Sequence, residues 1–314
     1  DMDQNKAFFD FVEQPHLIRL YGRVQHYAWG GFDFIPALIR QANTERQPFA
    51  EFWIGAHPKL PSLAQVSGFE MALDALIAAN PLQILGSHAA VLFEGKLPYL
   101  LKVLDVRQML SIQVHPTNQQ ARKGFERENH KQIPLDDPQR NYKDPFHKPE
   151  LHVALTEFWM LHGFRPLAEI EKMLKKTPAF APLADRYLKL AGKISNREER
   201  LAELYRMVMN MSQSHIDRMI GALLLEIEPQ LKKGTMRKSS PHYWTQQALQ
   251  QFPAAGGHFD PGLFSLYLFN LIRIPPGRGT FQAAGVPHAY LEGVTVELMA
   301  NSDNVLRGGL TSKY

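Results

Sequence analysis

The sequence contains no cysteine. Disulfide bonds and thiolate metal ligands are therefore excluded, and a bound metal ion would have to be held by nitrogen and oxygen atoms. A chain without cysteine fits a reducing compartment, and we expect a cytoplasmic protein.

Long apolar runs and a strong charge imbalance are also missing. No run approaches the length that a helix needs to cross a bilayer, and the segment AFFDFV near the start is interrupted by Asp10. The 35 basic and 31 acidic residues leave a net charge of +4, and the densest basic run, residues 232–240, has the composition of a solvated loop. We therefore expect neither a membrane nor a nucleic acid as a partner.

Motifs of several common enzyme classes are absent as well. The sequence has no G-x-S-x-G nucleophile motif, no P-loop and no G-x-G-x-x-G fingerprint. Nucleophilic catalysis and a glycine-rich phosphate cradle therefore have no support. A bound phosphate would need Arg and Lys side chains.

What is present is a globular composition, with 45% hydrophobic residues among 314. Short β-like runs separated by Gly and Pro extend from about residue 17 to 164, and strand-like sequence returns after residue 260. Between them, apolar residues recur at three- and four-residue intervals, which predicts helices. We expect a β domain (1–165 and 261–314) interrupted by a helical insertion domain (166–260), roughly ninety residues with the usual boundary error.

The run SIQVHP places three polar side chains on one face of a predicted strand. Side chains alternate along a strand, so Ser111, Gln113 and His115 point the same way, toward solvent or into a site. Pro116 ends the run. Thr117 and Gln120 have capping-box spacing, which predicts a helix immediately afterwards.

Three further segments carry polar residues where a strand would favour apolar ones. They are HKPELHVAL with Lys148, Glu150 and His152, AGVPHAY with His288, and VTVELMA with Thr295, Glu297 and Met299 on one face. Two histidines and one carboxylate on β-strands form a set that suits zinc or ferrous iron. His57 and His152 are equally plausible ligands on composition, and spacing does not choose among the thirteen histidines.

At these residues the sequence resembles the type I phosphomannose isomerases. The resemblance covers most of the β part, and the helical part resembles the family in position and length. The segments that carry it, in the family's order, are QHYAWG (25–30), AEFWIGAHP (50–58), LPYLLKVLDV (97–106), LSIQVHP (110–116), NYKDPFHKPEL (141–151) and PHAYLEGVTVELMANSDNVLRGGLT (287–311).

The resemblance implies an α+β protein, mainly a β cupin (jelly-roll) barrel with an α-helical insertion domain, and one zinc ion per chain. The implied zinc ligands are Gln113, His115, Glu150 and His288. The implied substrate or phosphate contacts are Ser111, Lys148, Arg307 and Lys313, with His57, Tyr290 and Asp303 lining the pocket. Relatives continue past the position of Tyr314 into a further β domain, which we expect to be absent here.

The implied reaction interconverts mannose 6-phosphate and fructose 6-phosphate through an enediol. We expect Glu297 to act as the base with assistance from Lys148, and Arg307 to stabilise the enediolate, because a guanidinium almost never deprotonates. One carboxylate and three neutral ligands would leave the zinc positively charged, which gives a reason for Gln113 as a ligand. The alternatives are a non-heme iron oxygenase and a non-catalytic sugar-phosphate-binding protein. We expect a monomer.

Overall fold

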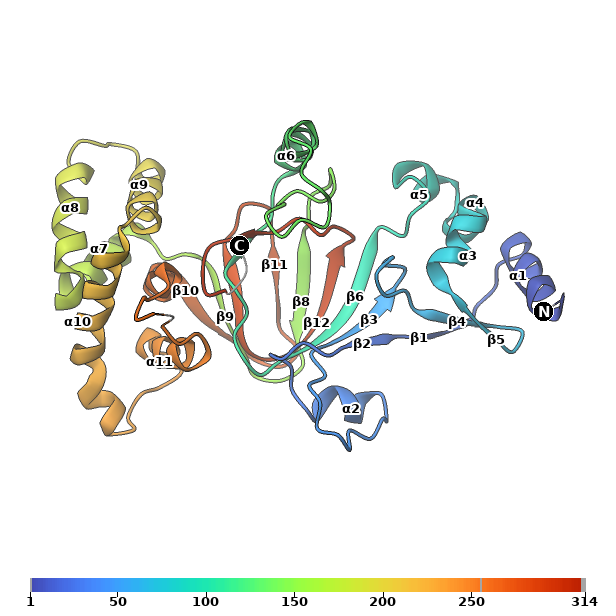
Figure 1. Ribbon diagram of the computed structural model, residues 1–314, viewed down its shortest axis with the longest axis horizontal. Helices are drawn as coiled ribbons and strands as arrows, with labels where there is room; N and C mark the ends of the chain where they lie inside the picture. Colours follow the sequence, from blue (N-terminus) through green and yellow to red (C-terminus); the bar gives the residue numbers. More distant parts are fainter. Residues whose placement is uncertain (1, 255, 312–314) are drawn as a thin grey trace.

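The computed structural model describes residues 2–254 and 256–311. Its parts follow one another across Figure 1: a group of helices at the left, a large sheet in the centre, and a smaller sheet with short helices at the right. The amino terminus lies at the right-hand end, whereas the last described strand belongs to the central sheet.

The central sheet contains ten strands, and all of their pairings are antiparallel. They are β2 (Arg23–Gln25), β3 (Glu51–Gly55), β6 (Tyr99–Val106), β7 (Gln113–Val114), β8 (Glu150–Ala154), β9 (Phe158–Phe164), β10 (Phe269–Ile274), β11 (Gly279–Gln282), β12 (His288–Ala300) and β13 (Leu306–Arg307). The main path runs β10-β9-β12-β6-β3-β2, and strand pairing does not close it into a barrel within the described residues. The fold is thus mixed α and β with antiparallel sheets.

The long strand β12 joins the two halves of this sheet. Its first part pairs with β7 and β9, and its last part pairs with β6 and β8. Between Tyr290 and Glu292 the register shifts, as at a β-bulge. Gly293 follows with φ of 124°, and a Cβ there would lie 2.5 Å from the carbonyl oxygen of Glu157, so the position requires glycine.

Beyond the bulge, the alternation predicted for VTVELMA is confirmed. Thr295, Glu297 and Met299 are buried, whereas Leu298 between them is 41% exposed. The polar side chains on this strand therefore face the interior of the protein rather than solvent.

Helices surround the sheet. They are α1 (Met2–Glu13), α2 (Phe34–Leu38), α3 (Leu73–Ala79), α4 (Pro81–Leu85), α5 (Ser87–Leu92), α6 (Asn118–His130), α7 (Leu167–Lys176), α8 (Ala181–Ala191), α9 (Arg197–Met209), α10 (Gln213–Lys232), α11 (Pro241–Gln251) and α12 (Ser265–Leu268), with 3₁₀ turns at Pro178–Phe180 and Pro261–Phe264. Among the described residues, no helix combines the length and the apolar character that a membrane crossing requires.

The helical periodicity expected after residue 166 is confirmed by α7 to α11. Their apolar stripes share one core with the central sheet, in which Ile170, Leu223 and Trp244 are almost fully buried beside Leu161 of β9. Burying a Leu or Ile side chain contributes about 1.5–3 kcal/mol, so this shared core fixes the helices against the sheet.

The capping box predicted at Thr117 is also confirmed. The backbone N–H of Gln120 donates to Thr117 Oγ1 at 3.2 Å, and the backbone N–H of Thr117 donates to Gln120 Oε1 at 2.9 Å. These bonds start α6 directly after Pro116. The strand before it, β7, is shorter than the run SIQVHP suggests.

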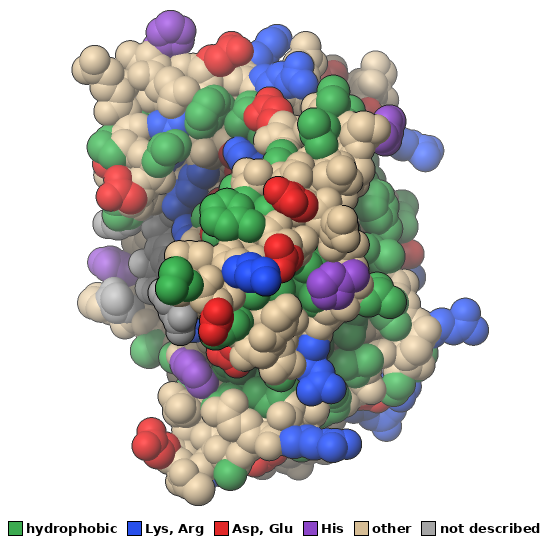
Figure 2. All heavy atoms as spheres, turned by 90° about the vertical axis from the view of Figure 1, so that its right-hand side faces the viewer, with side chains coloured by type: hydrophobic (Ala, Val, Ile, Leu, Met, Phe, Trp, Pro, Cys, Tyr) green, Lys and Arg blue, Asp and Glu red, His purple; other side chains and the backbone are tan. Residues whose placement is uncertain are grey.

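The end of the molecule that lies at the right in Figure 1, away from α7 to α11, contains a small three-stranded sheet. Its strands are β1 (Arg19–Tyr21), β4 (Leu63–Val66) and β5 (Phe69–Ala72). The segment AFFDFV lies in α1, where Phe11 and Val12 are buried in a core that also includes side chains of β4 and β5. On this face, basic, acidic and histidine side chains are scattered among apolar and neutral ones (Figure 2).

Candidate metal centre

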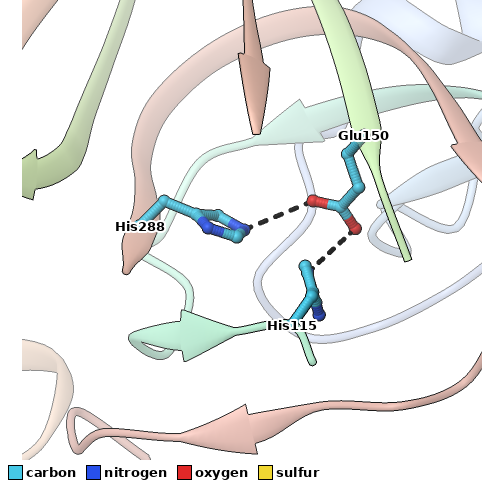
Figure 3. Close-up of side chains that lie close together, drawn as sticks. All are labelled: His115, Glu150 and His288. Atoms are coloured by element: carbon cyan, nitrogen blue, oxygen red, sulfur yellow. Dashed lines mark ion pairs between the residues drawn. The ribbon is translucent and has the colours of Figure 1, made fainter. Parts of the chain in front are cut away.

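Three side chains from distant parts of the sequence converge inside the sheet: His115 follows β7, Glu150 begins β8 and His288 begins β12 (Figure 3). His115 Nε2 lies 3.2 Å from Glu150 Oε1, and His288 Nε2 lies 3.3 Å from Glu150 Oε2. All three residues are buried, and one possible ligand atom from each lies within 4.8 Å of the others.

The protons of the two imidazoles are fixed by backbone carbonyl groups. His115 Nδ1 lies 3.0 Å from the carbonyl oxygen of Asn304, and His288 Nδ1 lies 3.0 Å from that of Val286. A carbonyl oxygen can only accept, so in their neutral forms both imidazoles carry the proton on Nδ1 and direct the Nε2 lone pair at Glu150. His115 Nε2 is buried and has no hydrogen-bond partner among the described residues. Two lone pairs and a carboxylate that converge in this way fit a metal cation between them.

The electrostatics of the group keep the carboxylate ionised. Burial acts to raise the pKa of Glu150, but its contacts with His115 and Lys148 outweigh burial and hold the pKa well below its ordinary value. Burial lowers the pKa of His115. For His288, burial also acts to lower the pKa, but the hydrogen bond to Glu150 and its charge raise it. The group thus combines an ionised carboxylate with two histidine rings whose neutral forms can bind a metal.

A cavity of about 100 Å³, which we call the metal-side cavity, lies beside this group. The structure brings seven residues singled out in the sequence to its wall: Ser111, Gln113, Lys148, Glu150, His288, Tyr290 and Glu297. Gln113 stands opposite His288 in the pairing of β7 with β12. Lys148 is buried, and its Nζ lies 3.4 Å from Glu150 Oε1.

Glu297 is the second buried carboxylate of this cavity. Its Oε2 accepts a 2.6 Å hydrogen bond from Tyr290 Oη. Burial and the negative charge of Glu150 raise the pKa of Glu297 to about 7, against opposing contributions led by Lys102. A carboxyl group with a pKa near neutrality can both accept and return a proton, as acid–base catalysis requires.

Two predicted pocket residues, His57 and Asp303, line a different cavity of about 420 Å³. His57 Nε2 lies 3.5 Å from Asp303 Oδ1, and Lys59 Nζ lies 2.6 Å from Asp303 Oδ2. The hydrogen bond from His57 holds the pKa of Asp303 well below its ordinary value.

Two other candidates, Arg307 and His152, do not line either cavity. Arg307 is exposed on β13 opposite Gln113, and no carboxylate of residues 2–254 or 256–311 forms an ion pair with it. Lys313 lies outside the described residues. His152 shares the buried face of β8, but its Nδ1 contacts Thr295 Oγ1 at 2.9 Å and its Nε2 contacts Thr280 Oγ1 at 2.7 Å. Both ring nitrogens of His152 therefore already have hydrogen-bond partners, which makes it a poorer candidate for a metal ligand than composition and strand position indicated.

Sequence reasoning missed two charged residues in the wall of the metal-side cavity, Glu51 on β3 and Lys102 on β6. Lys102 Nζ lies 3.2 Å from Glu51 Oε2 and 4.6 Å from the centre of the Trp53 ring. Burial acts to lower the pKa of Lys102, but the charges of Glu51 and Glu297 raise it. The signal was present in the sequence, because each is the only charged residue at an inward position of its otherwise apolar strand.

A buried site of two imidazoles and a carboxylate, with a second carboxylate of raised pKa beside it, is typical of a metal-dependent enzyme centre. Residues 17–167 match the family model described as "Phosphomannose isomerase type I, catalytic domain". The mannose-6-phosphate isomerase of Escherichia coli K12 is 39% identical over 297 residues, covering 94% of this chain and 71% of the relative.

Solved structures agree with this assignment. A zinc-bound mannose 6-phosphate isomerase superposes with a TM-score of 0.82 at 38% identity, covering 95% of this chain and 71% of that one. The enzyme of Salmonella typhimurium bound to fructose 6-phosphate and zinc superposes with a TM-score of 0.81 at the same identity and coverage. The chain belongs to the type I phosphomannose isomerase family.

Proposed function

We infer that this chain is a zinc-dependent aldose–ketose isomerase that interconverts mannose 6-phosphate and fructose 6-phosphate. The observation that carries this function is the convergence of His115, Glu150 and His288, with two Nε2 lone pairs directed at one buried carboxylate. Relatives more than 35% identical over most of the chain bear the name of this enzyme.

The metal site is proposed to consist of these three residues and Gln113. Gln113 lines the same cavity as Glu150 and His288, and its amide oxygen would add a neutral ligand. Only Glu150 would carry a negative charge, so the set would not neutralise a divalent cation. Zinc held there would act as a Lewis acid that stabilises negative charge developing on the sugar oxygens.

Proton transfer is assigned to Glu297. In the open-chain aldose its carboxylate would take the proton from C2, and the carboxylic acid would then return a proton to C1, while the hydroxyl proton passes from O2 to O1 to give the ketose. Tyr290 holds Oε2 of Glu297, which leaves Oε1 for this exchange. Lys148, buried beside Glu150, would assist by hydrogen bonding to a sugar oxygen.

The substrate is proposed to be held by Ser111, His57, Tyr290 and Asp303, and its phosphate by Arg307 and Lys313. Ser111 and Tyr290 line the metal-side cavity, and His57 and Asp303 line the neighbouring one. Arg307 has no ion-pair partner among the described carboxylates, so its guanidinium is available to a phosphate or to the enediolate.

We propose a cupin jelly-roll barrel formed by residues 1–165 and 261–314, with residues 166–260 as a helical insertion domain. The support is that β9 and β10 are antiparallel neighbours although α7 to α11 lie between them in sequence, so the helical segment leaves and rejoins the sheet at one edge. We also propose a monomer. We propose a cytoplasmic location on the absence of cysteine.

The deciding experiment measures metal content and isomerisation together. The purified protein should contain close to one zinc per chain, convert mannose 6-phosphate to fructose 6-phosphate, lose this activity on chelation and regain it with zinc. Activity that persists after complete metal removal would contradict the proposed function. Consumption of dioxygen that depends on iron would identify an oxygenase instead.

A further inference from the structure

Asn304, in the loop between β12 and β13, is fully buried and uses its whole side-chain amide. Its Oδ1 accepts hydrogen bonds from the backbone N–H groups of Lys143 at 2.7 Å and Asp144 at 3.2 Å. Its Nδ2 donates to the carbonyl oxygens of Asp144 at 2.7 Å and Phe146 at 2.8 Å. The amide therefore holds the loop of residues 143–146 in one conformation.

The main chain of the same residue contacts a proposed metal ligand. The carbonyl oxygen of Asn304 accepts the hydrogen bond from His115 Nδ1 at 3.0 Å. This bond keeps the proton on Nδ1, leaves Nε2 free for a metal and sets the rotation of the ring. The position of one backbone carbonyl thus decides whether His115 presents a lone pair to the site.

The loop held by the Asn304 side chain leads directly to the other side of the site. Two residues after Phe146 the chain reaches Lys148, and two residues later Glu150. Ser302 also holds this loop, because its Oγ donates to the Asp144 carboxylate at 2.9 and 3.0 Å. One buried amide therefore ties the segment that orients His115 to the segment that supplies Glu150.

We propose that Asn304 is a positioning residue that sets the geometry between His115 and Glu150 in the metal centre. This inference rests on the proposed function only in taking the bound metal as zinc. Loss of the amide would release two backbone N–H groups and two carbonyl groups inside the protein, and the 143–146 loop would move relative to His115. Removal of groups that orient metal ligands typically weakens metal affinity by about 10–100-fold.

The competing interpretation is that Asn304 only stabilises a loop, which predicts a less stable protein with unchanged zinc affinity. The variant Asn304→Ala separates the two. Asn43→Ala is the matched control, because Asn43 Nδ2 also donates to two carbonyl oxygens, of Phe32 at 2.9 Å and Gln47 at 2.8 Å. Asn43 contacts none of the residues assigned to the site.

Zinc affinity is measured by competition with a chelator, and the stability of the metal-free protein by thermal unfolding. We expect Asn304→Ala to bind zinc about 10–100-fold more weakly than the wild type. Asn43→Ala should unfold at a lower temperature with unchanged zinc affinity. Ser302→Ala, a milder change that removes the bond to Asp144, should weaken zinc binding in the same direction by a smaller factor.

Nitrogen-15 NMR of the metal-free protein gives a readout that a purely structural role would not change. The His115 ring should be the Nδ1–H tautomer in the wild type and a mixture of tautomers in Asn304→Ala. Wild-type zinc affinity and tautomer in a folded Asn304→Ala would overturn the inference while leaving the isomerase function intact. If that variant does not fold, unchanged zinc affinity in Ser302→Ala overturns it. A wild-type protein that binds zinc but converts no sugar phosphate contradicts the function alone, and one that binds no zinc contradicts both.

Discussion

Replacing Glu150 by Gln tests the metal centre most directly, because it removes the only negative charge of the set with little change in shape. Each oxygen of Glu150 faces one imidazole Nε2, at 3.2 and 3.3 Å. In the variant, an amide NH₂ would replace one of these oxygens and could satisfy a histidine lone pair itself. The amide would then compete with zinc for that lone pair, and the site would have lost the charge that attracts the cation.

The size of the effect follows from the number of ligands. Four-ligand zinc sites bind with about 10–16 kcal/mol of apparent free energy, or about 2.5–4 kcal/mol per ligand if it is shared equally. At 1.4 kcal/mol per factor of ten, losing one ligand weakens zinc binding by roughly 10²–10³-fold. At a fixed, saturating zinc concentration the bound protein loses the same free energy of unfolding, which lowers the Tm of a chain of 314 residues by about 4–6 °C.

The assay is thermal unfolding over a range of free zinc concentrations, with chelator competition for the dissociation constant. Asp217→Asn is the control, since Asp217 is partly buried but accepts from the backbone N–H of Phe259 at 2.8 Å, in the helical part of the chain. It should lower stability equally with and without zinc. A Glu150→Gln protein with the wild-type zinc affinity and zinc-dependent Tm rise would refute the assignment of this carboxylate.

Two further predictions concern the other carboxyl groups. Glu297→Gln should lower kcat by about 10²–10⁴-fold while the zinc content stays unchanged, because an amide cannot accept the C2 proton. Near-normal turnover would remove Glu297 from the role, and Tyr290→Phe should give a smaller loss. Away from the site, burial and the charge of Asp33 raise the pKa of Asp105 from 3.8 to about 6. The folded state therefore binds this proton more tightly than the unfolded chain, so the resulting stability is complete below pH 3.8 and is lost as pH rises through about 6. Asp105→Asn should flatten this part of the curve of unfolding free energy against pH, and an unchanged slope in denaturant titrations would refute the assignment.

Much of the site was visible in the sequence because strand alternation and the family resemblance agree there. Alternation alone placed Glu297 on an inward face, and the structure buries it. The resemblance chose His115 and His288 among thirteen histidines, which spacing could not do. His152 shows the limit of composition, since it lies on the predicted face and is excluded only by its contacts with two threonine hydroxyls.

The roles of Asn304 and Asp303 depend on contacts between distant residues, which no repeating pattern in the sequence predicts. Asn304 resembles an ordinary turn residue until the fold places its amide against residues 143–146, some 160 positions earlier. The separation of Asp303 from the metal-side cavity likewise depends on its pairing with His57 and Lys59. Such links between distant loops follow from the three-dimensional path of the chain.

The bulge in β12 determines how one strand can supply both a proposed metal ligand and the proposed base. In a regular strand, residues whose numbers differ by an odd number point to opposite faces. His288 and Tyr290 have even numbers and Glu297 has an odd one, yet all three line one cavity. The reason is the extra residue between Tyr290 and Glu292, after which the odd-numbered side chains point to the face that the even-numbered ones occupied before. Deleting one residue at the bulge would therefore keep the chemistry of every side chain but turn either the metal ligand or the proposed base away from the substrate. The site depends on the count of residues in this strand as strictly as on their identity.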